Sequence, residues 1–127
     1  MRIGFVTTSR ADFGIYLPLL KKIEANNNFE YLLFVSGMHF SEKFGLSYKA
    51  IEKEGLKITE LLETIEDSDS AVSIAKGMSN AIESHTIIWE KYSNKIDLLL
   101  VLGDRFEMFA IAASTIPFRI PLAHFHG

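Results

Sequence analysis

The stretch that decides the fold is Ile96-Asp97-Leu98-Leu99-Leu100-Val101-Leu102-Gly103-Asp104-Arg105-Phe106-Glu107. Its first part is a nearly unbroken apolar run, which is typical of a strand buried on both faces in a parallel sheet. After Gly103 we expect a helix, with Asp104 as its N-cap and Glu107 completing a capping box. A carboxylate and a guanidinium then lie at the carboxyl end of a central strand, where open α/β sheets bind ligands. The alternative is structural, with Asp104 only capping and Arg105 solvated.

The composition limits the classes of protein to consider. The chain has 127 residues, about the size of one domain, and 48% of them are hydrophobic, which suffices for a substantial core. A net charge of -3 disfavours the basic face that nucleic-acid binding needs, and the absence of cysteine excludes disulfides and thiolate metal sites. We find no signal-peptide pattern and no apolar segment of membrane-spanning length. The expectation is a cytoplasmic protein without nucleic-acid or membrane partners.

The last residues are unusual for a chain terminus. The sequence ends at Ala123-His124-Phe125-His126-Gly127, directly after an apolar strand, whereas most termini fray into polar residues. We therefore expect a cut chain whose parent continues.

Apolar strands alternate with amphipathic helices along the whole chain. The predicted strands are 2–7, 30–36, a short one within 56–62, 96–102 and 120–124, and the predicted helices are 12–25, 47–53, 70–92 and 105–114. Ser70 caps the longest helix, His85 lies on its apolar stripe as a packed histidine, and Pro18 falls near the first turn of its own helix. This order predicts an α/β fold, a doubly wound parallel sheet of about five strands.

The loop after the first strand, residues 7–14, has the chemistry of an anion site. It offers hydroxyls, backbone N–H groups and a helix N-terminus, and Arg10 adds a planar fork of donors. Gly14 is its only glycine, so it is neither a dinucleotide-binding G-x-G-x-x-G loop nor a Walker loop. In the structural alternative, Ser9 or Asp12 caps the helix and Arg10 is a surface charge.

Further candidate residues follow the other strands at the same edge of the sheet. They are His39 after the second strand, Asp104 and Arg105 after the fourth, and His124 and His126 at the end of the fifth. Strand alternation places His124 and His126 on one side, with Phe125 opposite. The H-x-H spacing can chelate a metal, but no third ligand has a specific spacing, and a carboxylate beside histidines favours proton transfer. We therefore expect no metal.

Four elements occur in order and carry a family resemblance. They are Ser9-Arg10-Ala11-Asp12-Phe13-Gly14, Ser36-Gly37-Met38-His39, Leu102-Gly103-Asp104-Arg105-Phe106-Glu107 and Ala123-His124-Phe125-His126-Gly127. Together they resemble the N-terminal part of the hydrolysing UDP-N-acetylglucosamine 2-epimerases, and the branch that feeds sialic-acid and legionaminic-acid synthesis is the closest match. The resemblance spans the chain. It implies a glycosyltransferase-B-like fold of two Rossmann-like domains, with residues 1–127 an incomplete N-terminal domain and the C-terminal domain absent.

The resemblance also implies an activity. Enzymes of this family eliminate UDP from UDP-N-acetylglucosamine, or from a UDP-2,4-diacetamido-6-deoxyhexose, and hydrate the resulting glycal with inversion at C2. The product is a manno-configured N-acetylhexosamine. The implied partner is a UDP-sugar substrate, no cofactor is expected, and the full-length parent is expected to form a homo-oligomer. The truncated chain alone would be inactive, because half of the active-site cleft would be missing.

Residue roles follow from the same resemblance. Asp104 matches a catalytic acid/base carboxylate. Many members carry His-x-Glu where this chain has His124-Phe125-His126. His126 therefore becomes the candidate for the second proton carrier, because histidine is a common general acid and base in catalysis. The implied substrate-binding set is Arg10, which matches a phosphate contact, Arg105, which matches a nucleotide contact, and the edge residues Gly14, His39 and His124.

Two other functions stay open at this point. A UDP-sugar glycosyltransferase of the same architecture would release UDP only when an acceptor is present. A non-catalytic, flavodoxin-like α/β binding module is the other alternative. A phosphoacceptor receiver is disfavoured, because Asp12 is the only acid in the first loop and no adjacent carboxylate accompanies it.

Overall fold

The computed structural model describes residues 1–37, 48–63 and 69–126. Its elements are β1 (Arg2–Thr7), α1 (Arg10–Glu24), β2 (Glu30–Ser36), α2 (Tyr48–Lys53), β3 (Glu60–Leu62), α3 (Ala71–Tyr92), the 3-10 turn η3 (Ser93–Lys95), β4 (Leu98–Leu102), α4 (Phe106–Ser114), the 3-10 turn η4 (Ile116–Phe118) and β5 (Leu122–Phe125). The five strands form one sheet in the order β3-β2-β1-β4-β5, and every pairing is parallel. The predicted doubly wound α/β sheet is confirmed.

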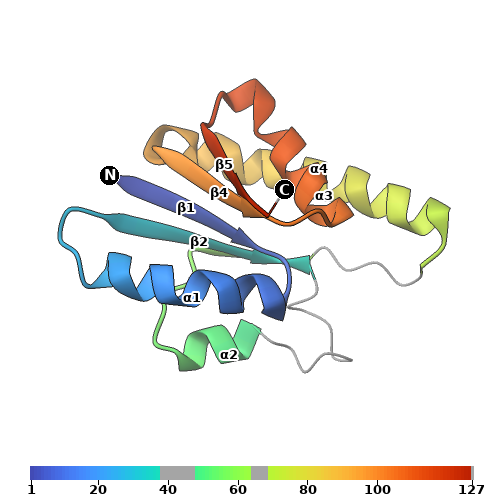
Figure 1. The fold of residues 1–127 in the computed structure, drawn as a ribbon. Helices are drawn as coiled ribbons and strands as arrows, with labels where there is room; N and C mark the ends of the chain where they lie inside the picture. Colours follow the sequence, from blue (N-terminus) through green and yellow to red (C-terminus); the bar gives the residue numbers. More distant parts are fainter. Residues whose placement is uncertain (38–47, 64–68, 127) are drawn as a thin grey trace.

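The sheet separates two hydrophobic layers (Figure 1). Helices α1 and α2 pack on one face, against side chains that include Phe5, Leu33 and Leu100. Helices α3 and α4 pack on the other face, where Val6 and Phe34 meet Trp89 and Met108. Neighbouring residues of one strand thus point into opposite cores, as the period of a strand requires. This burial on both faces explains the continuous apolar runs in the sequence.

Trp89 ties three elements of the second layer together. Its indole is fully buried, and its Nε1–H donates to Ser114 Oγ at the end of α4 over 2.7 Å. Its ring meets Phe34 of β2 edge-on, with ring centroids 5.4 Å apart. His85, one turn earlier on α3, is also fully buried, so the prediction of a packed histidine is confirmed.

Two predicted helix starts are wrong, for different reasons. Helix α1 begins at Arg10 because Ser9 is its N-cap, accepting from Asp12 N over 3.3 Å, and Pro18 therefore lies well inside the helix rather than near its first turn. Helix α4 begins at Phe106, and its N-cap is Arg105, which forms no side-chain capping bond. The capping box predicted for Asp104 and Glu107 does not form. The predicted Ser70 cap does form, with Ser70 Oγ accepting from Ser73 N.

Strand boundaries differ by one or two residues from the predictions. The fourth strand begins at Leu98 rather than at 96, and the fifth is Leu122–Phe125 rather than 120–124. The predicted helix cap Ser47 and most of the loops around it lie outside the described residues. Within the described part of the chain, no helix is both long and apolar enough to span a membrane.

Candidate functional site

The carboxyl ends of β1, β4 and β5 lie side by side at one edge of the sheet. Strand β4 pairs with β1 on one side and with β5 on the other. The backbone N–H of Gly103 donates to Phe125 O over 2.8 Å, which carries the β4–β5 pairing to the last residue of β5. The polar residues that follow these three strands are therefore neighbours, as the parallel topology predicts.

The loop between β1 and α1 is fixed by a buried carboxylate. Asp12 Oδ2 accepts from Thr8 N over 3.0 Å and from Thr8 Oγ1 over 2.8 Å, and both residues are buried. The N–H of Asp12 in turn donates to the Ser9 cap. Gly37, directly after β2, packs closely against the same loop. Its φ is +64, and an added Cβ would lie only 2.9 Å from Thr8 O. The loop is thus held in one conformation from two sides.

The two predicted site residues of this loop differ in their surroundings. Arg10 is exposed in the first turn of α1, and its guanidinium has no hydrogen bond or ion pair with the described residues. A ligand can therefore use its donors. Gly14 lies inside α1 instead of in the loop, and a Cβ added to it would meet no other atom within 4 Å. No close approach of neighbouring atoms therefore requires a glycine at this position.

The turn after β4 presents one free and one paired charge. Gly103, at φ +81, turns the chain out of the strand, and Asp104 follows it as an exposed residue with no hydrogen bond to the described residues. Arg105 is paired instead. Its Nε and Nη2 donate to the two carboxylate oxygens of Glu107 over 2.9 and 3.3 Å. This pairing raises the pKa of Arg105. Because the N-cap of α4 is Arg105, the carboxylate of Asp104 has no capping role.

The histidines of the fifth strand lie differently from the prediction. His124 Nε2 is 2.6 Å from Gly103 O. Since a carbonyl only accepts, Nε2 carries a proton and donates it to Gly103 O. His126 lies beyond the end of β5 with φ 58, so strand alternation does not extend to it, and the prediction that the two rings share a side by alternation is wrong.

One cavity of about 360 Å³ gathers three of the predicted residues, Asp104, Arg105 and His124. Its other walls are mainly apolar, with side chains from β4, α4 and β5: Val101, Met108, Phe109, Ala112 and Leu122. Arg10, Gly14 and His126 do not line it. His39 lies outside the described residues. Among the described residues, no group of three or more histidines and carboxylates could hold a metal ion.

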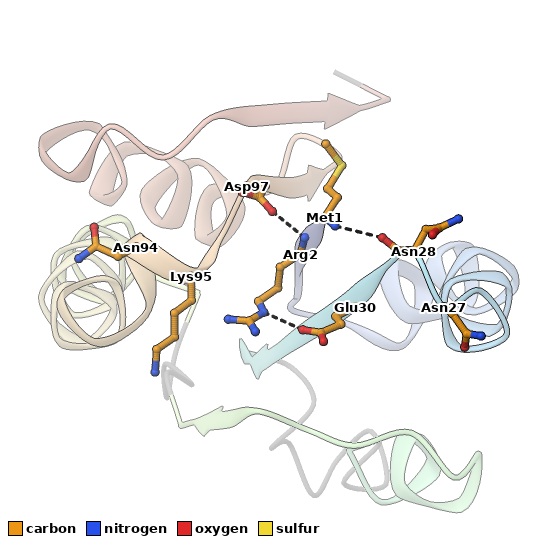
Figure 2. A pocket seen from close by; sticks show the side chains of 8 residues that line it. All are labelled: Met1, Arg2, Asn27, Asn28, Glu30, Asn94, Lys95 and Asp97. Atoms are coloured by element: carbon orange, nitrogen blue, oxygen red, sulfur yellow. Dashed lines mark hydrogen bonds and ion pairs between the residues drawn. The ribbon is translucent and has the colours of Figure 1, made fainter.

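A second cavity of about 350 Å³ lies at the opposite edge of the sheet (Figure 2). There the backbone N–H of Arg2 donates to Asp97 Oδ2 over 2.7 Å, and the Arg2 guanidinium pairs with Glu30 over 2.9 Å. The N-terminal amine donates to Asn28 O. These polar groups tie together the beginnings of β1, β2 and β4. They are at the amino ends of the strands, away from the edge where such sheets bind ligands.

Comparison with known proteins decides the family. Residues 21–127 match the family model described as UDP-N-acetylglucosamine 2-epimerase. The chain belongs to this family. It is 33% identical over 126 residues to a GDP/UDP-N,N'-diacetylbacillosamine 2-epimerase (hydrolyzing) of Campylobacter jejuni and 32% identical to the polysialic acid biosynthesis protein P7 of Escherichia coli, and both alignments cover 99% of the chain. The chain spans about a third of the length of these curated relatives, 32% in both.

Solved structures of this epimerase family share the fold. A UDP-N-acetylglucosamine 2-epimerase from Neisseria meningitidis, bound to UDP-GlcNAc, superposes with a TM-score of 0.75 at 19% identity, covering 98% of this chain and 32% of that one. A Methanocaldococcus jannaschii 2-epimerase, in complex with UDP-GlcNAc and UDP, superposes with a TM-score of 0.77 at 18% identity, with the same coverage. The predicted family and sheet architecture are confirmed.

Two residues that shape this edge were not among the predicted site residues. From the sequence, Asp12 was interpreted as a possible cap and as the only acid of the first loop, and Glu107 as part of a capping box. Their actual partners are Thr8 and Arg105. The sequence signal for both residues was their spacing. Asp12 lies three residues after Ser9, and Glu107 lies two residues after Arg105.

Proposed function

We propose that the protein carrying this chain is a hydrolysing UDP-sugar 2-epimerase, acting on UDP-N-acetylglucosamine or on a UDP-2,4-diacetamido-6-deoxyhexose. The observation that carries the proposal is the cavity at the carboxyl edge, where Asp104, Arg105 and His124 meet in a member of the epimerase family. The name of the Campylobacter relative, a diacetylbacillosamine 2-epimerase, supports the diacetamido substrate. No cofactor takes part in the proposed reaction.

The proposed chemistry removes the proton at C2 and then returns one to the opposite face. When a base takes the C2 proton, the electron pair forms the C1–C2 double bond and the bond from C1 to the UDP oxygen breaks. Water then adds across the double bond, with its hydroxyl at C1 and a proton at C2. Asp104 suits the first step, because its carboxylate is exposed and unpaired among the described residues. A C2 proton is weakly acidic, so the base must be closely positioned.

The remaining roles are proposed for the other polar residues of the edge. His126 is the second proton carrier, since it occupies the position of the family's glutamate and lies exposed just after β5. Arg10 and Arg105 bind the diphosphate. This is supported by the guanidinium of Arg10, which is unpaired among the described residues, and by the exposed part of Arg105. His124, Gly14 and His39 complete the proposed substrate-binding set. The sugar lies against the apolar wall of the cavity, whose side chains suit acetamido methyl groups.

We also propose the context in which the chain acts. Residues 1–127 form an incomplete N-terminal Rossmann-like domain, and a second domain closes the cleft, which fits a chain that spans 32% of its relative. The whole protein acts in the cytoplasm as a homo-oligomer. The exposed apolar side chain of Ile87 on α3, at 68%, supports such an assembly. Light scattering of the whole protein tests it, and a monomer at all concentrations would contradict it.

The experiment that tests the activity is UDP release without any acceptor. The whole protein is incubated separately with UDP-N-acetylglucosamine and with its 2,4-diacetamido-6-deoxy analogue, and UDP and the free sugar are quantified. We expect equal amounts of UDP and of a manno-configured sugar from one of them. Release that depends on an added acceptor would instead identify a glycosyltransferase, and no release from either would overturn the proposal.

A further inference from the structure

Glu107 has an environment that a helix-capping role does not explain. It is the second residue of α4, and its side chain is only 10% exposed. Burying a carboxylate is costly unless its oxygens are paired. Both oxygens bond to the same partner, the Arg105 guanidinium, through Nε at 2.9 Å and Nη2 at 3.3 Å. Both hydrogen bonds that the Glu107 carboxylate makes to the described residues therefore come from one side chain.

The pairing fixes the orientation of Arg105 and leaves donors free. A guanidinium has five N–H donors in one plane, and Glu107 takes two of them. The side chain of Arg105 is 43% exposed, whereas that of Glu107 is almost covered. The carboxylate thus holds the guanidinium from the protein side, and the remaining donors, including both on Nη1, are left for a ligand at the cavity that Arg105 lines.

Charge alone does not account for this arrangement. An arginine is protonated at any physiological pH, so the raised pKa of Arg105 changes nothing in its charge state. The carboxylate in fact cancels part of the positive charge that an anion would meet. What the pair supplies is geometry, since a long side chain with several rotatable bonds is kept in one orientation before the ligand arrives.

The backbone explains how these two residues meet. Side chains two apart on a helix do not face each other. Arg105, however, precedes the helix in an extended conformation, with φ -69 and ψ 149, while Glu107 is helical. The change of backbone conformation between them lets the guanidinium fold back over the first turn of α4. There the carboxylate also benefits from the positive end of the helix dipole.

We propose that Glu107 is a positioning residue, which pre-orients Arg105 for the diphosphate of the UDP-sugar. This inference rests on the proposed function for the identity of the ligand. It predicts that Glu107 acts on nucleotide binding only through Arg105, and that it takes no part in proton transfer at C2.

The test is a double-substitution cycle on UDP affinity, measured by calorimetry on the whole protein. We expect Glu107→Gln to weaken UDP binding about tenfold, equivalent to about 1.4 kcal/mol. Arg105→Ala should weaken it at least as much. In the Arg105→Ala background, adding Glu107→Gln should change the affinity by less than about twofold, because the residue through which Glu107 acts is gone. The single variant Glu107→Gln should raise KM for the UDP-sugar far more than it lowers kcat.

A matched control separates this role from ordinary stabilisation. Glu30 pairs with Arg2 over the same 2.9 Å, at the amino ends of the strands. Glu30→Gln therefore makes the same chemical change away from the candidate site, and it should leave UDP affinity unchanged. If Glu107→Gln fails to fold, Glu107→Asp serves in the same cycle, because it keeps the charge but is one methylene too short for both bonds. It should weaken UDP binding as well.

UDP affinity tests the positioning role of Glu107, and UDP release from a UDP-sugar tests the epimerase activity, so the two proposals can fail separately. Tighter UDP binding by Glu107→Gln would show that Glu107 competes with the ligand and would overturn the inference. So would unchanged affinity, or losses that add up fully in the double variant. If the wild type shows this cycle for UDP but releases none from a UDP-sugar, the proposed function fails and the positioning role stands.

Discussion

Acidification should destabilise the protein through His85, a residue remote from the candidate site. Its ring is fully buried in α3. Nδ1 lies 2.8 Å from Ala81 O and therefore carries the proton, while the buried Nε2 has no partner in the described structure. A second proton on Nε2 would place a charge in an apolar layer beside Trp89, whose ring centroid is 5.9 Å away. Burial accordingly lowers the pKa of His85 to about 4.

The size and sign of the effect follow from this value. The unfolded chain binds the proton near pH 6.5, the ordinary value for histidine, whereas the folded chain binds it only near about 4. The stabilisation is therefore complete above about pH 6.5 and is lost as the pH falls toward the folded-state pKa. At about 1.36 kcal/mol per pKa unit, the loss amounts to about 3 kcal/mol of unfolding free energy.

The assay is urea unfolding followed by the fluorescence of Trp89, the only tryptophan in the sequence. Wild type and His85→Leu are compared between about pH 7 and about pH 4. The stability difference between them should change by about 3 kcal/mol in favour of the leucine variant as the pH falls. His126→Asn, at an exposed histidine, should follow the wild type. Parallel curves for wild type and His85→Leu would show that protonation of His85 does not destabilise the folded state.

The remaining predictions concern the candidate site and its supports. Asp104→Asn should lower kcat by at least about a hundredfold with little change in UDP affinity, and equal losses in both would contradict a catalytic role. Asp12→Ala should lower the free energy of urea unfolding by about 2 to 3 kcal/mol, because it leaves the buried N–H and hydroxyl of Thr8 unpaired. Asp12→Asn keeps an acceptor and should lower it by less than about 1 kcal/mol. Gly37→Ala should lower the unfolding free energy by about 2 kcal/mol, since its Cβ would lie 2.9 Å from a backbone oxygen. Gly14→Ala, on the open surface of a helix, should raise it by up to about 1 kcal/mol. Equal effects of the two substitutions would contradict this difference in surroundings.

The sheet could be predicted from the sequence because its strands are buried on both faces. The continuous apolar runs indicated the existence of β1, β2 and β4, and the alternation with helices indicated their parallel pairing. The edge strand β5 was predicted less accurately. Its residues are mostly exposed, so the apolar pattern that defines a buried strand's limits is weak there.

The details of the site escaped prediction where two local structures compete for one side chain. Ser9 and Asp12 both suit an N-cap, and the buried bonds of Asp12 to Thr8 decide in favour of Ser9. At the start of α4, Glu107 could complete a capping box or pair with Arg105. The extended backbone of Arg105 favours the pairing, which is the one that forms. Such choices depend on tertiary contacts and backbone angles, which a sequence pattern does not contain. The placement of His39 stays a prediction.

We propose that the carboxylate of Asp104, exposed at the carboxyl edge of β4, serves an elimination at C2 of a UDP-sugar. Running the whole protein with its UDP-sugar in deuterium oxide tests it most directly, with the released sugar analysed by NMR and mass spectrometry. We expect one deuterium at C2 of a manno-configured product, formed at least about a hundredfold more slowly by Asp104→Asn. Release of UDP with the original hydrogen and configuration retained at C2 would contradict it.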